Sequence, residues 1–129
     1  MSSSPITVAI VEDNRGTREG LVELLGRAPN LRCVGSYASG EDAVRDLPAQ
    51  QPKVVLMDIN LPGMSGLDAL HALREADETR NIPVIALTAA ASERDKQRGE
   101  QAGFFRYLTK PVQVDEFEAA LEAVLASGS

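Results

Sequence analysis

The sequence predicts an α/β fold in which five strand-helix units build a parallel sheet. Short β-like runs alternate along the chain with longer amphipathic segments, which is the pattern of repeated βα units. The clearest strand-like run, residues 54–57, consists of four uninterrupted apolar residues, as expected for a strand covered on both faces. At 129 residues the chain has room for one such domain and for no second folded module.

Apolar spacing and chain breakers delimit the first units. Residues 6–11 form the first expected strand, and a helix is expected at about 15–27. The apolar stripe of this helix consists of Leu21, Leu24 and Leu25. Pro29 and Asn30 break the helix, and residues 31–36 form the second expected strand.

The next two helices follow from a start signal and from apolar spacing. Ser39, with Asp42 three residues later, resembles a capping box that opens a helix ending near Pro48. The strand at 54–57 comes next, and a third helix is expected to run from about 67 to 78. Its inner stripe consists of Leu67, Leu70 and Leu73.

The last two units differ strongly in the polarity of their helices. Residues 83–88 form the fourth expected strand, and the helix expected at 93–102 is polar nearly all round. Such a helix gains little from packing, so it is expected to be the loosest element and a natural moving part. Residues 104–109 form the fifth expected strand. The final helix presents an apolar face made of Phe117, Leu121, Val124 and Leu125.

Composition narrows the class of function. The formal charge of -6 argues against direct binding to nucleic acid or to an anionic membrane, because either would need a basic surface. Residues 1–5 lack the basic start and apolar stretch of a signal peptide and are interpreted as a disordered leader, which predicts a cytoplasmic protein. The domain is expected to span residues 6–126, with a frayed end at 127–129. The lone Cys33 is interpreted as a small core residue.

Residues capable of chemistry follow four of the five expected strands. Glu12 and Asp13 come after the first strand, and Asp58 comes after the third. Thr88 closes the fourth strand, and Lys110 follows the fifth. Because the carboxyl ends of parallel strands meet at one edge of a sheet, these side chains are expected to converge in one shallow site.

The three carboxylates of Glu12, Asp13 and Asp58 are expected to need a compensating cation. Two carboxylates about 4 Å apart repel by roughly 4 kcal/mol at an effective dielectric near 20. Oxygen ligands of high negative charge suit a hard divalent ion, so Mg²⁺ is the expected cofactor, with Mn²⁺ as the alternative. Lys110 and Thr88 add the charge and the donor that a phosphoryl group needs, which makes Asp58 the expected nucleophile and site of an aspartyl phosphate.

Four segments, taken together, match one known pattern. In chain order they are residues 11–14 (VEDN), 56–66 (LMDINLPGMSG), 86–89 (ALTA) and 107–111 (YLTKP). With these segments at these spacings, the chain resembles the receiver domain of bacterial response regulators, and its length is close to that of the single-domain chemotaxis type. The resemblance implies a doubly wound sandwich with five parallel strands in the order 2-1-3-4-5 and five flanking helices.

The resemblance implies specific roles at the acidic end of the site. Glu12 and Asp13 would hold Mg²⁺ directly or through water, and Asn60 would offer the metal its backbone carbonyl. Asp58 would be a metal ligand as well as the phosphoacceptor. The phosphoryl group would come from a sensor histidine kinase or from a histidine phosphotransfer protein.

The same resemblance implies a switch. Thr88 would bond to a phosphoryl oxygen and Lys110 would pair with it, while Tyr107 would turn inward as Thr88 moves. The peptide bond between Lys110 and Pro111 would be cis. Phosphorylation would bias the face made by the last two helices and the last strand, where a downstream protein binds. The protein would be a monomer or a phosphorylation-dependent dimer.

The protein is expected not to be an enzyme, although the predicted acceptor would catalyse its own phosphorylation. Three alternative functions remain open. The first half resembles receivers of transcription factors and residues 103–111 resemble receivers of hybrid sensor kinases, so the chain is alternatively a fragment or a recombined receiver. A module that signals without phosphorylation is disfavoured by the intact acidic site. A haloacid-dehalogenase-type phosphatase would need a second Asp two residues after Asp58, where Asn60 stands.

Overall fold

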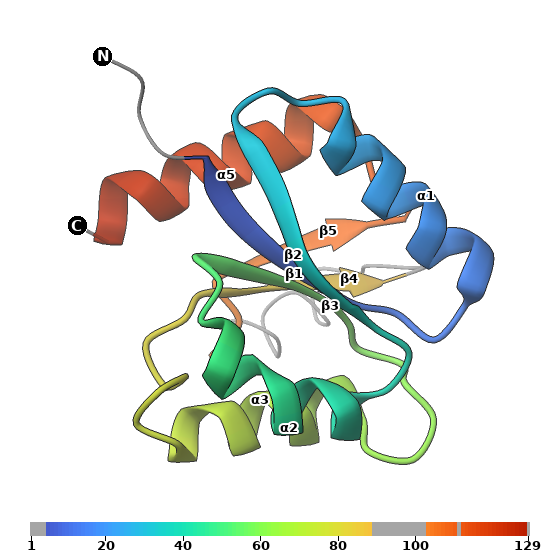
Figure 1. Cartoon of the computed structure of the whole chain (residues 1–129), viewed down its shortest axis with the longest axis vertical. Coiled ribbons are helices and arrows are strands. Elements are labelled where there is room, and N and C mark those ends of the chain that lie inside the picture. The colour runs from blue at the N-terminus through green and yellow to red at the C-terminus, as the bar shows by residue number, and fades with distance from the viewer. Residues whose placement is uncertain (1–4, 89–102, 111, 129) are drawn as a thin grey trace.

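The computed structural model describes residues 5–88, 103–110 and 112–128. These residues form five strands and four helices (Figure 1). The strands are β1 (Ile6–Val11), β2 (Leu31–Tyr37), β3 (Val54–Asp58), β4 (Val84–Thr88) and β5 (Arg106–Thr109). The helices are α1 (Arg15–Gly26), α2 (Gly40–Gln50), α3 (Gly66–Glu75) and α5 (Val114–Gly128). The expected helix at 93–102 and residues 1–4 of the expected leader at 1–5 lie outside the described residues.

All five strands belong to one parallel sheet with the order β2-β1-β3-β4-β5. This order confirms the topology that the sequence resemblance implied. Every residue of β3 and of β4 is buried, which is the physical reason for the uninterrupted apolar runs in these central strands. Asp58 is the last residue of β3 and is aligned with Leu87 of β4.

Helices cover both faces of the sheet and create two separate cores. In Figure 1, α1 and α5 lie on one face, and α2 and α3 lie on the other. Because side chains alternate along each strand, neighbouring residues enter different cores: Leu56 packs with the first helix pair, while Met57 packs with the second. No helix in the described part of the chain has both the length and the apolar character that a membrane span requires.

Polar side chains begin three of the helices by accepting a hydrogen bond from a backbone N–H in the first turn. Ser39 Oγ accepts from the N–H of Asp42 at 3.1 Å, as the predicted start of α2 requires. Ser65 Oγ and Asn14 Oδ1 do the same for α3 and α1, at 3.1 Å and 2.9 Å. These caps fix where each helix begins relative to the strand before it.

The predicted end of α2 near Pro48 was wrong, because the helix continues to Gln50. The proline removes one backbone donor in the last turn, where little of the helix remains to be disrupted. Gln51 then ends the helix in a left-handed conformation with φ of 45° and donates its N–H to the carbonyl of Leu47. Burial of Leu47 against the second core holds this final turn in place.

Two leucines that the predicted apolar stripes included are exposed instead. Leu67 is 41% exposed and Leu125 is 47% exposed, although their spacing places both on the apolar stripes of their helices. Helix α3 ends at Glu75 rather than near residue 78, and the hydroxyl of Thr79 donates to the carbonyl of Leu73 at 2.6 Å. Helix α5 continues to Gly128, two residues past the expected domain end.

Candidate functional site

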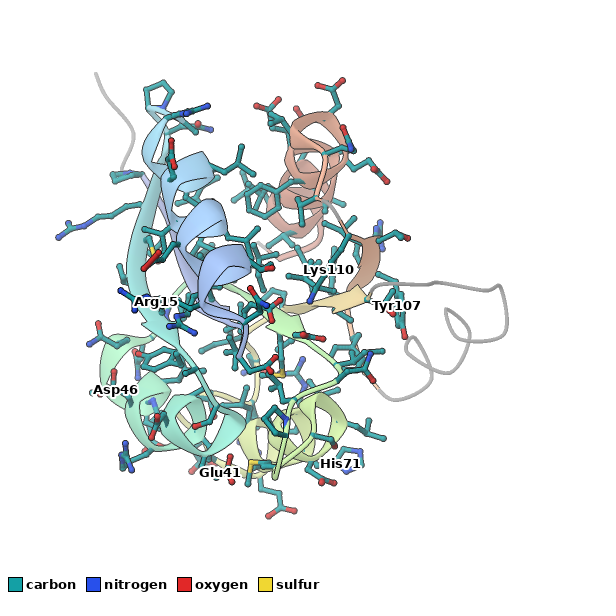
Figure 2. All side chains as sticks on the ribbon, turned by 90° about the vertical axis from the view of Figure 1, so that its right-hand side faces the viewer. Arg15, Glu41, Asp46, His71, Tyr107 and Lys110 are labelled. Atoms are coloured by element: carbon teal, nitrogen blue, oxygen red, sulfur yellow. The ribbon has the colours of Figure 1, made fainter. Side chains whose placement is uncertain are left out.

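The predicted site residues converge at the carboxyl edge of the sheet. Neighbouring strands β1, β3, β4 and β5 end there side by side, and each brings one predicted residue with it. These residues are Glu12, Asp58, Thr88 and Lys110. Figure 2 shows Lys110 at the ends of the strands, with Tyr107 farther out on the flank of β5. The convergence that the sequence predicted is therefore present.

Lys110 lies between two buried carboxylates. Its Nζ is 2.8 Å from Oδ2 of Asp58 and 2.5 Å from Oε1 of Glu12. The side chains of Asp58 and Glu12 are only 6% and 1% exposed, whereas that of Lys110 is 22% exposed. One ammonium group thus neutralises part of the charge of two carboxylates that have almost no contact with water.

Burial and neighbouring charges shift the pKa values of Glu12 and Lys110. Burial raises the pKa of Glu12, although the Lys110 ammonium and the N–H of Asn14 partly oppose the effect. Burial alone would lower the pKa of Lys110, but the carboxylates of Asp58 and Glu12 outweigh it and raise the pKa above its usual value. The lysine consequently stays charged at neutral pH, and burial disfavours the ionised form of Glu12.

Asp13 completes a group of carboxylates that suits a metal ion. One carboxylate oxygen from each of Glu12, Asp13 and Asp58 lies within 4.8 Å of the others. Asp13 is exposed, and the partner of the buried Oε1 of Glu12 in the described part of the chain is the Lys110 ammonium at 2.5 Å. Three convergent carboxylates that share one ammonium group form an all-oxygen ligand set with negative charge to spare, which fits a hard divalent cation such as Mg²⁺.

The loop after β3 shapes the surroundings of Asp58. The N–H of Asn60 donates to Oδ1 of Asp58 at 2.9 Å, so both oxygens of the carboxylate have a donor. Gly63 has φ of 71°, as a type II turn requires at its third position. Asn60 therefore lies beside the predicted acceptor, while a metal bond from its backbone carbonyl stays a prediction.

The predicted switch residues are only partly covered by the described chain. Thr88 is buried at the end of β4, and its carbonyl accepts from the N–H of Lys110 at 2.7 Å. Tyr107 is half-buried and packs against the core beneath α2 and α3. Pro111 lies outside the described residues, so the cis bond after Lys110 stays a prediction.

Three further residues contribute to this site, although the sequence alone assigned them no role. Asn14 donates its N–H to Oε2 of Glu12 at 3.1 Å, and Arg18 donates to the carbonyl of Glu12 at 2.8 Å. Gly66 approaches the backbone of Asp58 so closely that a Cβ there would be 2.7 Å from its carbonyl oxygen. The available signals were a helix-capping Asn after the acidic pair, a basic residue in the first turn, and a Gly opening α3.

Residues 8–122 match the family model of the response regulator receiver domain. The chain belongs to this family. Its five-stranded parallel sheet, in the order β2-β1-β3-β4-β5, is that of a receiver domain of two-component signalling.

Curated relatives of this receiver domain include both short and longer response regulators. The polar-differentiation response regulator DivK of Brucella anthropi is 36% identical over 121 residues, which cover 94% of this chain and 97% of the relative. The probable transcriptional regulatory protein TcrX of Mycobacterium tuberculosis is 38% identical over 125 residues, which cover 94% of this chain. The match spans only 50% of TcrX, so this receiver domain corresponds to about half of that protein.

Solved receiver structures share the fold closely. The receiver domain of a Pseudomonas aeruginosa sensor histidine kinase has a TM-score of 0.81 and 32% identity, and the match covers 96% of this chain and all of that one. That structure holds a magnesium ion coordinated in its active-site cleft. The receiver domain of a NarL regulator from Mycobacterium tuberculosis has a TM-score of 0.85 with 26% identity, over 95% of this chain and 98% of that one.

Proposed function

We propose that this receiver domain is a phosphorylatable switch whose acceptor is Asp58. The proposal rests on the surroundings of the Asp58 carboxylate. It is buried at the end of a strand, one of its oxygens pairs with Lys110, and the other accepts a hydrogen bond from the N–H of Asn60. These two donors align the carboxylate and remain to stabilise charge after the acceptor is modified. The phosphodonor would be a sensor histidine kinase or a histidine phosphotransfer protein.

The chemical step requires only an exchange at phosphorus. An oxygen of Asp58 forms a new bond to phosphorus, and the bond from phosphorus to the donor's leaving group breaks with its electrons on that group. Lys110 balances the negative charge that remains, since its raised pKa keeps it protonated. Glu12 and Asp13 would hold Mg²⁺, which when bound neutralises charge on the phosphoryl oxygens.

The output of the proposed switch would pass through a protein partner. Thr88, buried at the end of β4, would bond to the phosphoryl group, and the half-buried ring of Tyr107 would follow it inward. The partner would then bind the face that contains β5 and α5, either as a downstream target or as a second copy of this chain. The cytoplasm is the compartment in which we expect this exchange.

Phosphorylation of the acceptor can be tested with a small donor. Incubation with acetyl phosphate and Mg²⁺ should add one phosphoryl mass to the intact protein, as measured by mass spectrometry. Asp58→Asn should add none, whereas Asp68→Asn, which changes an exposed carboxylate on α3, should behave like the parent. An unmodified parent under saturating donor would overturn the proposal.

Metal binding can be tested separately from phosphorylation. Titration calorimetry of the parent with Mg²⁺ should show one binding event. Asp13→Ala should weaken it strongly, because the change removes one of three convergent carboxylates and leaves the ion pairs of Lys110 intact. An Asp13→Ala protein that binds Mg²⁺ as tightly as the parent would exclude this carboxylate as a ligand.

A further inference from the structure

Arg18 is a basic side chain next to the acidic pair, yet it bonds to the backbone of that pair. This half-buried residue of α1 donates from one guanidinium nitrogen to the carbonyl of Glu12 at 2.8 Å and to the carbonyl of Asp13 at 3.4 Å. In the described part of the chain it forms no ion pair with either carboxylate. Arg18 therefore does not neutralise the carboxylates of Glu12 and Asp13, but it links the backbone of these two residues to α1.

Glu12 and Asp13 differ in what fixes them. Glu12 donates its N–H to the carbonyl of Tyr37, its carboxylate accepts from Asn14 and pairs with Lys110, and its carbonyl accepts from Arg18. The Asp13 carboxylate is exposed and accepts no hydrogen bond from the residues that the structure describes. Its distance from the other two carboxylates therefore depends on where the backbone of Asp13 lies.

Only a few contacts hold the backbone of Asp13. Asn14 caps α1 through its side chain, which accepts from the N–H of Thr17 at 2.9 Å. Arg18 reaches back from the same helix to the carbonyls on the other side of this loop. The two contacts clamp the residues between β1 and α1 from both ends.

We propose that Arg18 is a positioning residue for the cation site, which holds the loop so that the Asp13 carboxylate faces Asp58. This inference rests on the proposed function, since it concerns the same metal site. Residues behind the ligands of a metal commonly contribute to its affinity by orienting those ligands. Here the orienting group acts on the backbone of the ligand rather than on its carboxylate.

Electrostatic repulsion and positioning by Arg18 predict opposite changes in Mg²⁺ affinity when Arg18 is removed, so an experiment can separate them. A guanidinium close to a divalent cation repels it, so removal of the charge should tighten Mg²⁺ binding. Loss of positioning should weaken binding instead, because the free loop must be ordered again each time the ion binds. The sign of the change in affinity therefore separates the two effects.

The test compares Arg18→Met with Arg15→Met. Methionine keeps the apolar stem of a half-buried arginine, so the fold is retained while the donors and the charge are lost. Arg15 is the matched control, because it lies on the same helix but is 82% exposed and pairs only with Glu19 among the described residues.

Calorimetric titration with Mg²⁺ should show an affinity reduced on the order of 10-fold for Arg18→Met and unchanged for Arg15→Met. With acetyl phosphate as donor, Arg18→Met should need more Mg²⁺ for half-maximal phosphorylation but should reach the parent rate at saturating Mg²⁺. Arg18→Lys, which retains a donor at this position, should recover part of the affinity.

An Arg18→Met protein that binds Mg²⁺ as tightly as the parent, or more tightly, would overturn the inference and leave the proposed function intact. Equal weakening by Arg15→Met would overturn it as well, because the effect would then not depend on the contact of Arg18 with the two carbonyls. A parent protein that binds no Mg²⁺ would refute the metal site itself, and the role of Arg18 with it.

Discussion

Nζ of Lys110 lies 2.8 Å from Oδ2 of Asp58, although 52 positions separate the two residues in the chain. The same nitrogen is 2.5 Å from Oε1 of Glu12. The ammonium group of Lys110, which follows β5, therefore contacts carboxylates at the ends of β1 and β3. The energetics of the receiver site depend on this contact, because both carboxylates are buried and neither is fully neutralised by it.

Lys110→Ala should destabilise the metal-free protein by about 2 kcal/mol at neutral pH, because removal of one partner leaves buried charge uncompensated. Urea denaturation should show the loss, and Mg²⁺ should recover part of it by supplying a new cation. Lys53→Ala removes the same charge from an exposed position and should change little. Equal stability of the two variants would show that Lys110 does not support the buried carboxylates.

Glu12→Gln should stabilise the metal-free protein increasingly as the pH rises from about 4.5 to neutral. The pKa of Glu12 is raised by burial, so the folded protein holds this proton more tightly than the unfolded chain does. Its contribution to stability is full below the unfolded value of 4.5 and is lost as the pH rises through the folded pKa. Thermal melts across this range should diverge, and parallel curves for parent and variant would contradict the assignment.

Tyr37→Phe should cost about 1–2 kcal/mol without affecting Mg²⁺ binding. The Tyr37 hydroxyl donates to Oδ2 of Asp46 at 2.5 Å and joins β2 to α2, whereas the link from Tyr37 to Glu12 is a backbone hydrogen bond. Burial and this bond to Asp46 both raise the pKa of the Tyr37 hydroxyl. Denaturation and calorimetry on the same samples would reveal any coupling between this hydroxyl and the metal site.

Gly66→Ala and Gly20→Ala should change stability in opposite directions. A Cβ on Gly66 would lie 2.6 Å from Cα of Ile59 and 2.7 Å from the carbonyl oxygen of Asp58, and backbone atoms cannot move aside alone. A loss of about 2 kcal/mol is expected, together with slower phosphorylation by acetyl phosphate. A Cβ on Gly20 would meet no atom of another element within 4 Å, so alanine there should add about 0.5–1 kcal/mol. Urea denaturation of both variants would decide the matter.

The sheet and its functional edge could be predicted from the sequence because both require particular types of residue. Strands buried on two faces require uninterrupted apolar residues, and the charged residue that ends such a run, Asp58, stands out against it. The limits of the helices were less predictable, as Leu67, Leu125 and the helix end beyond Pro48 show. Helical spacing reveals that a stripe exists, but contact with the sheet decides where the stripe stops.

The different surroundings of Glu12 and Asp13 could not be predicted from the sequence either. Adjacent acids look equivalent there, yet Glu12 continues the pairing of β1 through its bond to Tyr37 and is buried, while Asp13 is exposed. A basic residue in the first turn of α1 marks Arg18 as a candidate, but its residue type does not indicate which acceptor it contacts, since a backbone acceptor is available in every residue. Such backbone contacts can be found only once the helix is placed.

Lys110 follows the final strand, so it is synthesised after the other residues of the site. Asp58 leaves the ribosome well before β5, so a nascent chain carries the proposed acceptor without the ammonium that holds it. Contacts between distant parts of a chain form only after the entropy of loop closure has been overcome. The ion pair between Lys110 and Asp58 is thus completed only when β5 has joined the sheet.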